Sequence, residues 1–251
     1  MKFIQRFQFF IDVPRDFSIG GFTGKVSQGA LLTYLKQKNP NLWEKLHEGN
    51  HQRPYSIFPF TKISNGATIG VATTDEELSQ TILRIIVEDD YGTIKLVKNE
   101  FPVYQVQFSK VNPVPAEPPK VGSGFALRFQ TPAIFPDPNR KRKVDPFLNL
   151  QKLWYTTQKT YEMLTGEALD EDLPQRIEKQ VAITNFEIKS AKVSLTKTAK
   201  VFATMGYLKF VVEENDGLEH LNRLVQTMEH WGIGGKRAMG FGKVKVKYFR
   251  N

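Results

Sequence analysis

A glycine-rich stretch near the C-terminus is the part of the sequence whose residue types point most clearly to chemistry. Residues 232–242 read GIGGKRAMGFG. Their glycines and cations are Gly232, Gly234, Gly235, Lys236, Arg237, Gly240 and Gly242. Glycine tolerates positive φ, and backbone N–H groups in such a loop can face a phosphate beside the two cations. The alternative is a helix C-cap and a tight turn, and the missing Gly-Lys-Ser/Thr ending excludes a nucleotide-binding P-loop.

Histidine is the other residue type here that suits proton transfer, because its ordinary pKa is about 6.5. The sequence has four histidines and no cysteine, which excludes disulfides, thiolate metal sites and a cysteine nucleophile. We expect no metal cluster and no cofactor. His47 and His51 lie in one polar loop that ends at Arg53, whereas His220 and His230 flank a predicted helix and are interpreted as structural or solvated. A histidine in a polar loop is most often a surface residue.

The charge balance favours a polyanionic partner. Lys and Arg number 35 against 26 acidic residues, which leaves a net charge of +9. Such an excess favours nucleic acid or an anionic membrane surface, and the alternative is a basic protein kept in solution by its charge. Two sets of cations are candidates for a nucleic-acid path. They are Arg140, Lys141, Arg142 and Lys143 in one run, and Lys189, Lys192, Lys197 and Lys200 on predicted strands.

The elements that position these residues follow from hydrophobic periodicity. Residues 2–13 alternate as a strand, and Ser27 is predicted to cap a helix over 28–38. Asn39 and Pro40 end that helix and start a short helical turn before the polar loop. Further elements predicted in this half are strands over 55–61, 69–72, 93–98 and 102–111 and a helix over 74–86.

The proline-rich residues 112–120 are predicted to be a linker between domains at 1–111 and 121–251. The second half is predicted to contain strands over 125–130, 182–197, 200–213 and 243–249, helices over 147–164 and 218–230, and a loop over 131–145. Each half then runs strand, helix, strand, strand, helix, strand. This order predicts an α+β protein of two tandem ferredoxin-like (βαββαβ, RRM-like) domains.

No apolar run approaches the roughly 20 residues of a membrane span. The N-terminal residues alternate and carry charge, which is a strand pattern rather than a signal peptide. Together with the absence of cysteine, this leads us to expect a cytoplasmic protein.

The glycine-rich stretch resembles the C-terminal signature of the CRISPR-associated repeat-RNA endoribonucleases. The shared pattern is Gly-Ile-Gly, five residues, Gly-Phe-Gly and a short basic strand. Other segments similar to that family, in family order, are GALL at 29–32, NPNL at 39–42, LHE at 46–48, RPYS at 53–56, FALRFQTPAIF at 125–135 and GYLKFV at 206–211. The resemblance spans nearly the whole chain. It implies two ferredoxin-like domains and cleavage of the long CRISPR transcript within each repeat.

The resemblance also implies site residues. His47 matches a catalytic histidine of the family and would move a proton while the RNA 2′-OH attacks, leaving a 2′,3′-cyclic phosphate without a metal. His51 shares its loop and is a rival or second catalyst. Arg53 would stabilise the negative charge of the transition state. Some relatives use a tyrosine where this chain has Leu32, and Tyr34 should face another direction, so no tyrosine is carried over.

Two other function classes stay open on the sequence. One is a non-catalytic RNA-binding subunit of a CRISPR surveillance complex. The other is a general RNA-recognition module, which should show stacking aromatic residues on an exposed sheet face, and no such motif stands out. The expected partner is CRISPR repeat RNA (pre-crRNA), with other CRISPR effector subunits as candidates and no membrane. The chain is expected to be a monomer or a homodimer.

Overall fold

The computed structural model of the 251-residue chain describes residues 3–47, 53–88, 90–111, 114–136, 144–145, 148–195 and 199–249. The chain divides into two compact units. The N-terminal unit contains Ile4–Val111 together with Ala238–Gly240, and the C-terminal unit contains Met1–Phe3, Asn112–Arg237 and Phe241–Asn251. Three residues of the glycine-rich stretch therefore belong to the N-terminal unit.

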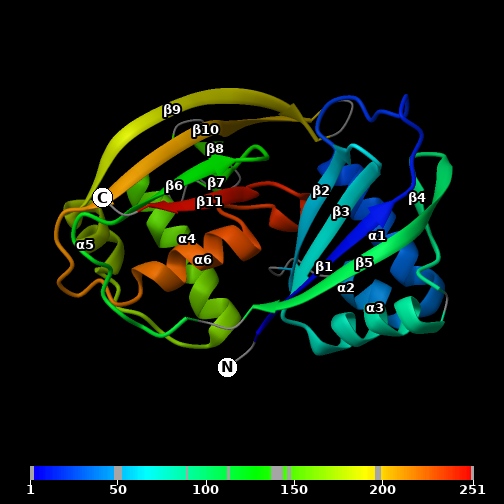
Figure 1. Ribbon diagram of the computed structural model, residues 1–251, viewed down its shortest axis with the longest axis horizontal. Helices are drawn as coiled ribbons and strands as arrows, with labels where there is room; N and C mark the ends of the chain where they lie inside the picture. Colours follow the sequence, from blue (N-terminus) through cyan, green and yellow to red (C-terminus); the bar gives the residue numbers. More distant parts are fainter. Residues whose placement is uncertain are drawn as a thin grey trace. The chain divides into compact units, whose positions relative to one another are not determined.

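The N-terminal unit is built on one antiparallel sheet in the order β2-β3-β1-β5-β4. Its strands are β1 (Ile4–Ile11), β2 (Tyr55–Ile63), β3 (Gly66–Thr73), β4 (Thr93–Leu96) and β5 (Asn99–Val111). Its helices are α1 (Gly24–Lys38), α2 (Pro40–His47) and α3 (Glu76–Glu88) (Figure 1). The order contains the predicted strand, helix, strand, strand, helix, strand, with α2 at the predicted helical turn and β4 within the strand predicted over 93–98.

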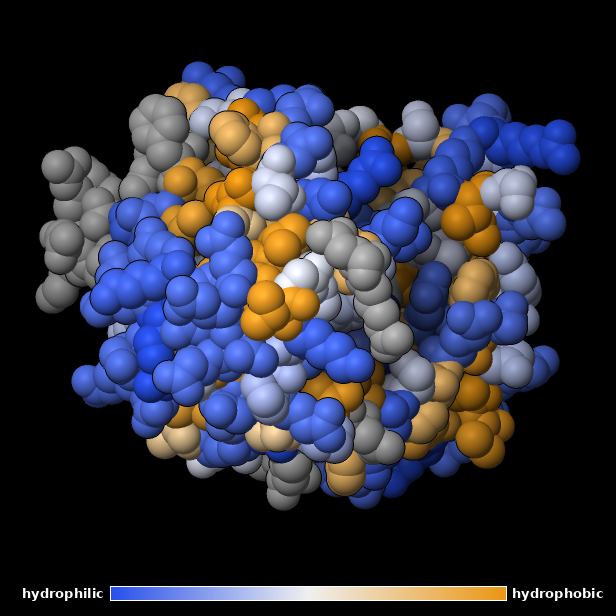
Figure 2. All heavy atoms as spheres, turned by 60° about the vertical axis from the view of Figure 1, so that its left-hand side comes forward, coloured by the Kyte–Doolittle hydropathy of each residue, from blue (hydrophilic) through white to orange (hydrophobic). Residues whose placement is uncertain are grey.

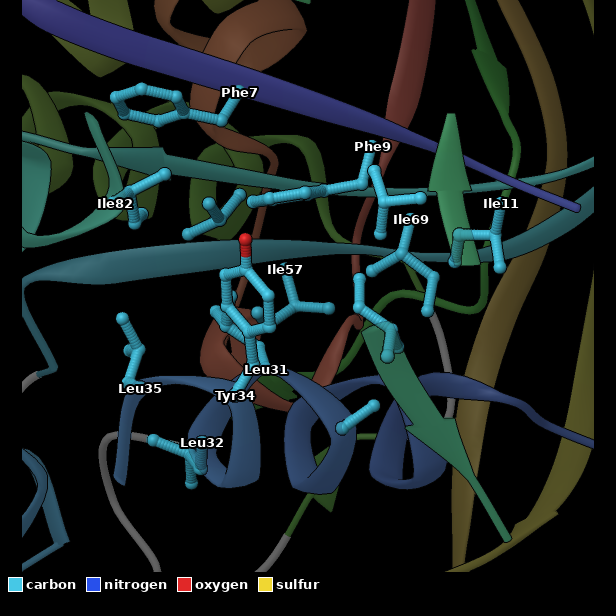
Figure 3. Packing of buried hydrophobic residues seen from close by; sticks show 14 of the residues in the cluster. Phe7, Phe9, Ile11, Leu31, Leu32, Tyr34, Leu35, Ile57, Ile69 and Ile82 are labelled. Atoms are coloured by element: carbon cyan, nitrogen blue, oxygen red, sulfur yellow. The ribbon is translucent and has the colours of Figure 1, made fainter. Parts of the chain in front are cut away.

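Alternation along β1 produces the core of this unit. Phe7, Phe9 and Ile11 point to one side of the strand and are buried. Figure 3 shows them above the apolar side of α1, where Leu31 and Leu35 point up towards the sheet. A side chain on every second strand residue thus meets side chains at helical spacing, which is how one sheet face and one helix stripe exclude water.

Ser27 does not cap α1 as predicted. The helix begins one turn earlier, with Thr23 as its N-cap residue. The Ser27 hydroxyl donates to the Thr23 carbonyl oxygen (3.0 Å) and accepts from the Phe60 backbone N–H (2.8 Å). Ser27 therefore lies inside α1, where its hydroxyl satisfies the buried N–H of a β2 residue. This contact outweighs the local preference of serine for a cap position.

The C-terminal unit has a four-stranded antiparallel sheet in the order β11-β6-β10-β9. Its strands are β6 (Gly124–Phe129), β9 (Val181–Ser194), β10 (Lys200–Val212) and β11 (Val244–Phe249), with two-residue strands β7 (Phe135–Pro136) and β8 (Val144–Asp145). Its helices are α4 (Leu150–Thr165), α5 (Leu173–Gln180) and α6 (Leu221–Trp231). The long elements again follow the predicted order, so the predicted fold of two ferredoxin-like domains is confirmed.

Two details of this unit differ from the sequence predictions. Helix α5 was not predicted, because it is only eight residues long and carries a proline near its start; its buried Ile177 holds it against the core. Helix α4 begins at Leu150 rather than at residue 147, because the Asn149 side chain accepts a hydrogen bond from the Lys152 N–H (3.1 Å) and so forms the N-cap.

On the face drawn in Figure 2 hydrophilic side chains predominate, and hydrophobic ones form small groups between them. Among the helices of the described residues, none is both long enough and apolar enough to cross a membrane.

Candidate active site

The glycine-rich stretch, residues 232–242, is held in place by backbone hydrogen bonds. The Ile233 N–H donates to the Gly242 carbonyl oxygen (2.8 Å), and the Gly242 N–H donates to that of Pro132 (2.8 Å). The Gly235 N–H donates to the Ile134 carbonyl oxygen (2.7 Å). These three N–H groups are therefore satisfied by carbonyl oxygens and do not face a phosphate. The base of the stretch is a turn whose backbone is hydrogen-bonded to the Thr-Pro segment that follows β6.

Glycine is required at the far end of this stretch. Gly242 has φ +72°, and a Cβ there would collide with the Ile233 carbonyl oxygen. Gly240 has φ +78°, and a Cβ there would press on the Pro59 ring and lie 3.0 Å from the Gly24 Cα. Since Gly24 is the first residue of α1, the tip formed by Ala238–Gly240 lies beside the start of that helix, within the N-terminal unit.

The two cations of the stretch point to different places. Lys236 is exposed and has a φ of +57°. Arg237 is only 8% exposed, and its Nη1 donates to the Gly234 carbonyl oxygen. Burial lowers the pKa of Arg237 to about 10, so its guanidinium is still charged at neutral pH. Of the two cations predicted to contact phosphate, Lys236 is on the surface, whereas Arg237 binds the loop from within.

Helix α2 carries the predicted catalytic histidine. Asn39 starts the helix, with its Oδ1 accepting from the Leu42 N–H (3.0 Å), and Leu42 and Leu46 are buried. His47 is the last residue of α2; its side chain lies outside the described part of the structure, as does the whole of His51. The structure thus locates the helix that presents the predicted loop.

Arg53 lies at the other end of that loop, half-buried just before β2. Its neighbour Tyr55 is 1% exposed, and the Tyr55 hydroxyl accepts a hydrogen bond from Gln28 Nε2 (3.1 Å). Burial raises the pKa of Tyr55, while the Gln28 hydrogen bond and the positive charge of Arg53 act to lower it. The contact between Gln28 and Tyr55 was not predicted, because a glutamine inside a helix and a tyrosine inside a strand carry no local signal of it. Tyr34, by contrast, is buried in the core, and its hydroxyl donates to the Tyr91 carbonyl oxygen (2.9 Å).

The predicted basic residues of β9 are exposed. Lys189 pairs with Met205 and Lys192 with Phe202 on the neighbouring strand, and the Lys192 Nζ lies 5.9 Å from the centre of the Phe202 ring. Being three residues apart, the two lysines point to opposite faces of the strand. Lys200, the first residue of β10, is also exposed. The other basic candidates, Arg140, Lys141, Arg142, Lys143 and Lys197, lie outside the described residues.

Comparison with known proteins bears on both units. Residues 127–244 match the family model of CRISPR-associated endoribonuclease Cas6. A Cas6 product complex has a TM-score of 0.77 and 17% identity, and the match covers 98% of this chain and 100% of that chain. Thermus thermophilus Cas6 has a TM-score of 0.75 and 16% identity, and the match covers 98% of this chain and 99% of that chain. A Cas6-related protein from Pyrococcus furiosus has a TM-score of 0.63 and 14% identity, and the match covers 98% of each chain. No curated protein sequence matches the chain.

Proposed function

We propose that this chain is a member of the CRISPR-associated endoribonuclease Cas6 family, that it binds CRISPR repeat RNA and that it cuts the precursor transcript into crRNAs. The match of residues 127–244 to the family model carries the proposal. Three further observations support it: the net charge of +9, the fold shared with Cas6 structures across both units, and the glycine-rich stretch.

The reaction we propose needs only proton transfer and charge stabilisation by the protein. A base removes the proton of the RNA 2′-OH, whose oxygen attacks the adjacent phosphorus. The bond from phosphorus to the 5′-oxygen breaks, and an acid gives that oxygen a proton. A 2′,3′-cyclic phosphate and a 5′-OH remain. His47 is our first candidate for the acid or base, and His51 is the second, because a histidine can exchange a proton near neutral pH.

Arg53 is the proposed electrostatic residue. A guanidinium stays protonated at neutral pH and offers planar hydrogen-bond donors to the oxygens of a phosphorane. Its position supports this role, because Arg53 is half-buried and follows six residues after His47, the last residue of α2. Arg53 also lies two residues before the buried Tyr55, and its positive charge acts to lower the pKa of that hydroxyl.

The proposed RNA contacts come from the exposed cations. In the glycine-rich stretch we assign phosphate contact to Lys236 and assign Arg237 to holding the loop, since Arg237 is buried. Lys189 and Lys192 on β9 and the run Arg140 to Lys143 complete the proposed RNA path. The glycines Gly232, Gly234, Gly235, Gly240 and Gly242 would act through the shape of the loop.

Cleavage of a repeat RNA in excess EDTA tests this function. We expect a 2′,3′-cyclic phosphate or 3′-phosphate product, and no cleavage when the nucleotide upstream of the cut carries 2′-deoxyribose. Loss of cleavage in EDTA that magnesium restores would overturn the metal-independent mechanism. Tight binding with no cleavage under any condition would instead indicate the non-catalytic RNA-binding subunit.

A further inference from the structure

Among the described residues of the C-terminal unit, helices cover one face of the sheet, and no helix lies on the other, which is called the open face. Side chains on the covered face, among them Leu127, Leu208 and Val246, are at most 7% exposed and form the core with α4 and α6 (Figure 1). Their neighbours in sequence point the other way. The residues on that other face of β11, β6 and β10 are Lys245, Lys247, Phe249, Gly124, Ala126, Arg128, Tyr207, Lys209 and Val211.

Strand register places the cations of this open face side by side. Arg128 on β6 pairs directly with Lys245 on one side and with Tyr207 on the other. The next row pairs Ala126 with Lys247 and with Lys209. Arg128, Lys245 and Lys247 are exposed, and Lys209 is half-buried. The small Ala126 leaves the space between Lys247 and Lys209 unfilled by a large side chain.

This arrangement is unfavourable for the free protein. Like charges directly opposite each other weaken an antiparallel pair, and Arg128 and Lys245 are such a pair. Within the described residues, no carboxylate forms an ion pair with Arg128, Lys245 or Lys247. Lysines on an edge strand commonly prevent sheet-to-sheet pairing, which would explain the two lysines of β11. This explanation does not apply to Arg128 and Lys209, because they lie on the two central strands, β6 and β10.

Aromatic rings accompany the cations. Tyr207 is half-buried beside Arg128. Phe249 covers Gly124, where a Cβ would collide with its ring, and the Lys209 Nζ lies 4.4 Å from the centre of that ring. A cation and a flat ring side by side suit a nucleotide, whose phosphate and base they can hold together. An acidic protein surface would form ion pairs with the cations but would not stack on the Tyr207 ring.

We propose that the open face formed by Arg128, Tyr207, Lys209, Lys245 and Lys247 binds single-stranded RNA. The strand must be single because only unpaired bases can turn out to stack on a side chain. Phosphates would lie along the cations of β11 and β6, and one base would stack on Tyr207. The inference deepens the proposed function, since it assigns a surface to an unpaired segment of the RNA, and it uses none of the residues proposed for cleavage.

Binding of a 12-nucleotide fluorescein-labelled oligouridylate, followed by anisotropy, tests the proposal. Tyr207→Ala should weaken binding about ten-fold, within the range for loss of one stacked base, and Tyr207→Phe should restore it. The double variant Lys245→Gln, Lys247→Gln should also weaken binding. The plot of log affinity against log salt should become less steep by about 1.4, the value for two phosphate contacts on a single strand.

The double variant Lys95→Gln, Lys98→Gln is the matched control. It removes the same charge from exposed positions on β4 and the turn after it, in the N-terminal unit. The proposal fails if this control weakens binding as much as the β11 variant, because the effect is then only net charge. It also fails if Tyr207→Ala binds oligouridylate like the wild type, or if a 12-base-pair RNA duplex shows the same losses. Competition by phosphatidylserine vesicles that is lost in the β11 variant would assign the face to a membrane surface instead.

Cleavage of repeat RNA separates this proposal from the proposed function. Thermal unfolding should confirm that the Tyr207→Ala variant is folded, and single-turnover cleavage of repeat RNA by the wild-type protein tests the proposed function without that variant. A wild-type protein that binds oligouridylate through Tyr207 and cuts no repeat RNA would overturn the proposed function and support the open face. If the wild-type protein cuts repeat RNA while Tyr207→Ala binds oligouridylate normally, the proposed function stands and the proposal for the open face is overturned.

Discussion

Arg237 donates a hydrogen bond from its Nη1 to the carbonyl oxygen of Gly234, so its guanidinium lies inside the glycine-rich stretch. The residue before it, Lys236, is exposed. Two adjacent cations of one loop therefore do different work: one holds the turn, and the other is available to a ligand. This division can be tested residue by residue.

The first prediction separates these two cations. Arg237→Ala leaves a buried carbonyl without its donor and should lower the free energy of unfolding by about 1–3 kcal/mol. Lys236→Ala should change it by less than about 0.5 kcal/mol but weaken repeat-RNA binding. Urea denaturation and RNA titration on both variants measure this. Equal stability losses, or wild-type RNA affinity in Lys236→Ala, would contradict the division of roles.

The second prediction concerns the tip of the stretch. Gly240→Val forces a β-branched residue to φ +78° and against Pro59 and Gly24. We expect a loss of about 1–3 kcal/mol in the free energy of unfolding, seen as a lower Tm. Gly29→Ala is the control, because a Cβ at this α1 position meets nothing within 4 Å and should stabilise the helix by about 0.5–1 kcal/mol. A Gly240→Val protein as stable as the wild type would mean that the tip does not pack as described.

The third prediction separates the two histidines of the proposed cleavage site. His47→Ala should slow single-turnover cleavage by about 10²- to 10⁴-fold, the usual cost of losing general acid–base catalysis. Affinity for repeat RNA should change much less, because Lys and Arg contacts to phosphate dominate it. His51→Ala should lose clearly less activity. A larger loss at His51 would move the catalytic role there, and normal rates in the double variant would remove both residues from the mechanism.

The fourth prediction concerns alkaline stability. Burial, and then the hydrogen bond from the Tyr161 hydroxyl to Glu167 (2.6 Å), raise the pKa of Tyr161 to about 12 against the opposing charge of Arg223. The fold thus favours the neutral phenol, and this stabilisation is present below the ordinary pKa of 10.0 and lost as the pH rises towards 12. Urea denaturation between pH 9 and 11.5 should show a smaller loss of stability in Tyr161→Phe than in the wild type. Part of the loss should persist, because burial also raises the pKa of Tyr248 to about 12. Identical pH profiles in the two proteins would exclude this role of Tyr161.

The elements of both units follow from local patterns in the sequence. Alternation predicted the strand that is β1, and helical spacing predicted the helix that is α6, and both elements are present. Phe7 and Phe9 of β1 and Leu224 and Met228 of α6 are buried. Such patterns involve residues that are neighbours in the chain, so periodicity alone reveals them. The family resemblance also came from short segments in order along the chain, and the family model matches residues 127–244, which contain the glycine-rich stretch.

The tertiary structure decided the places of individual side chains. Ser27 looked like a cap but satisfies the N–H of Phe60, which is 33 residues away. Lys236 and Arg237 look equivalent in the sequence, and only the turn at Lys236 sends the next side chain inward. No stacking motif on a sheet face stands out in the sequence, because Tyr207, Arg128 and Lys245 become neighbours only through strand register. Local propensity acts over a few residues, whereas these contacts join distant segments whose pairing is set by the packing of the whole unit.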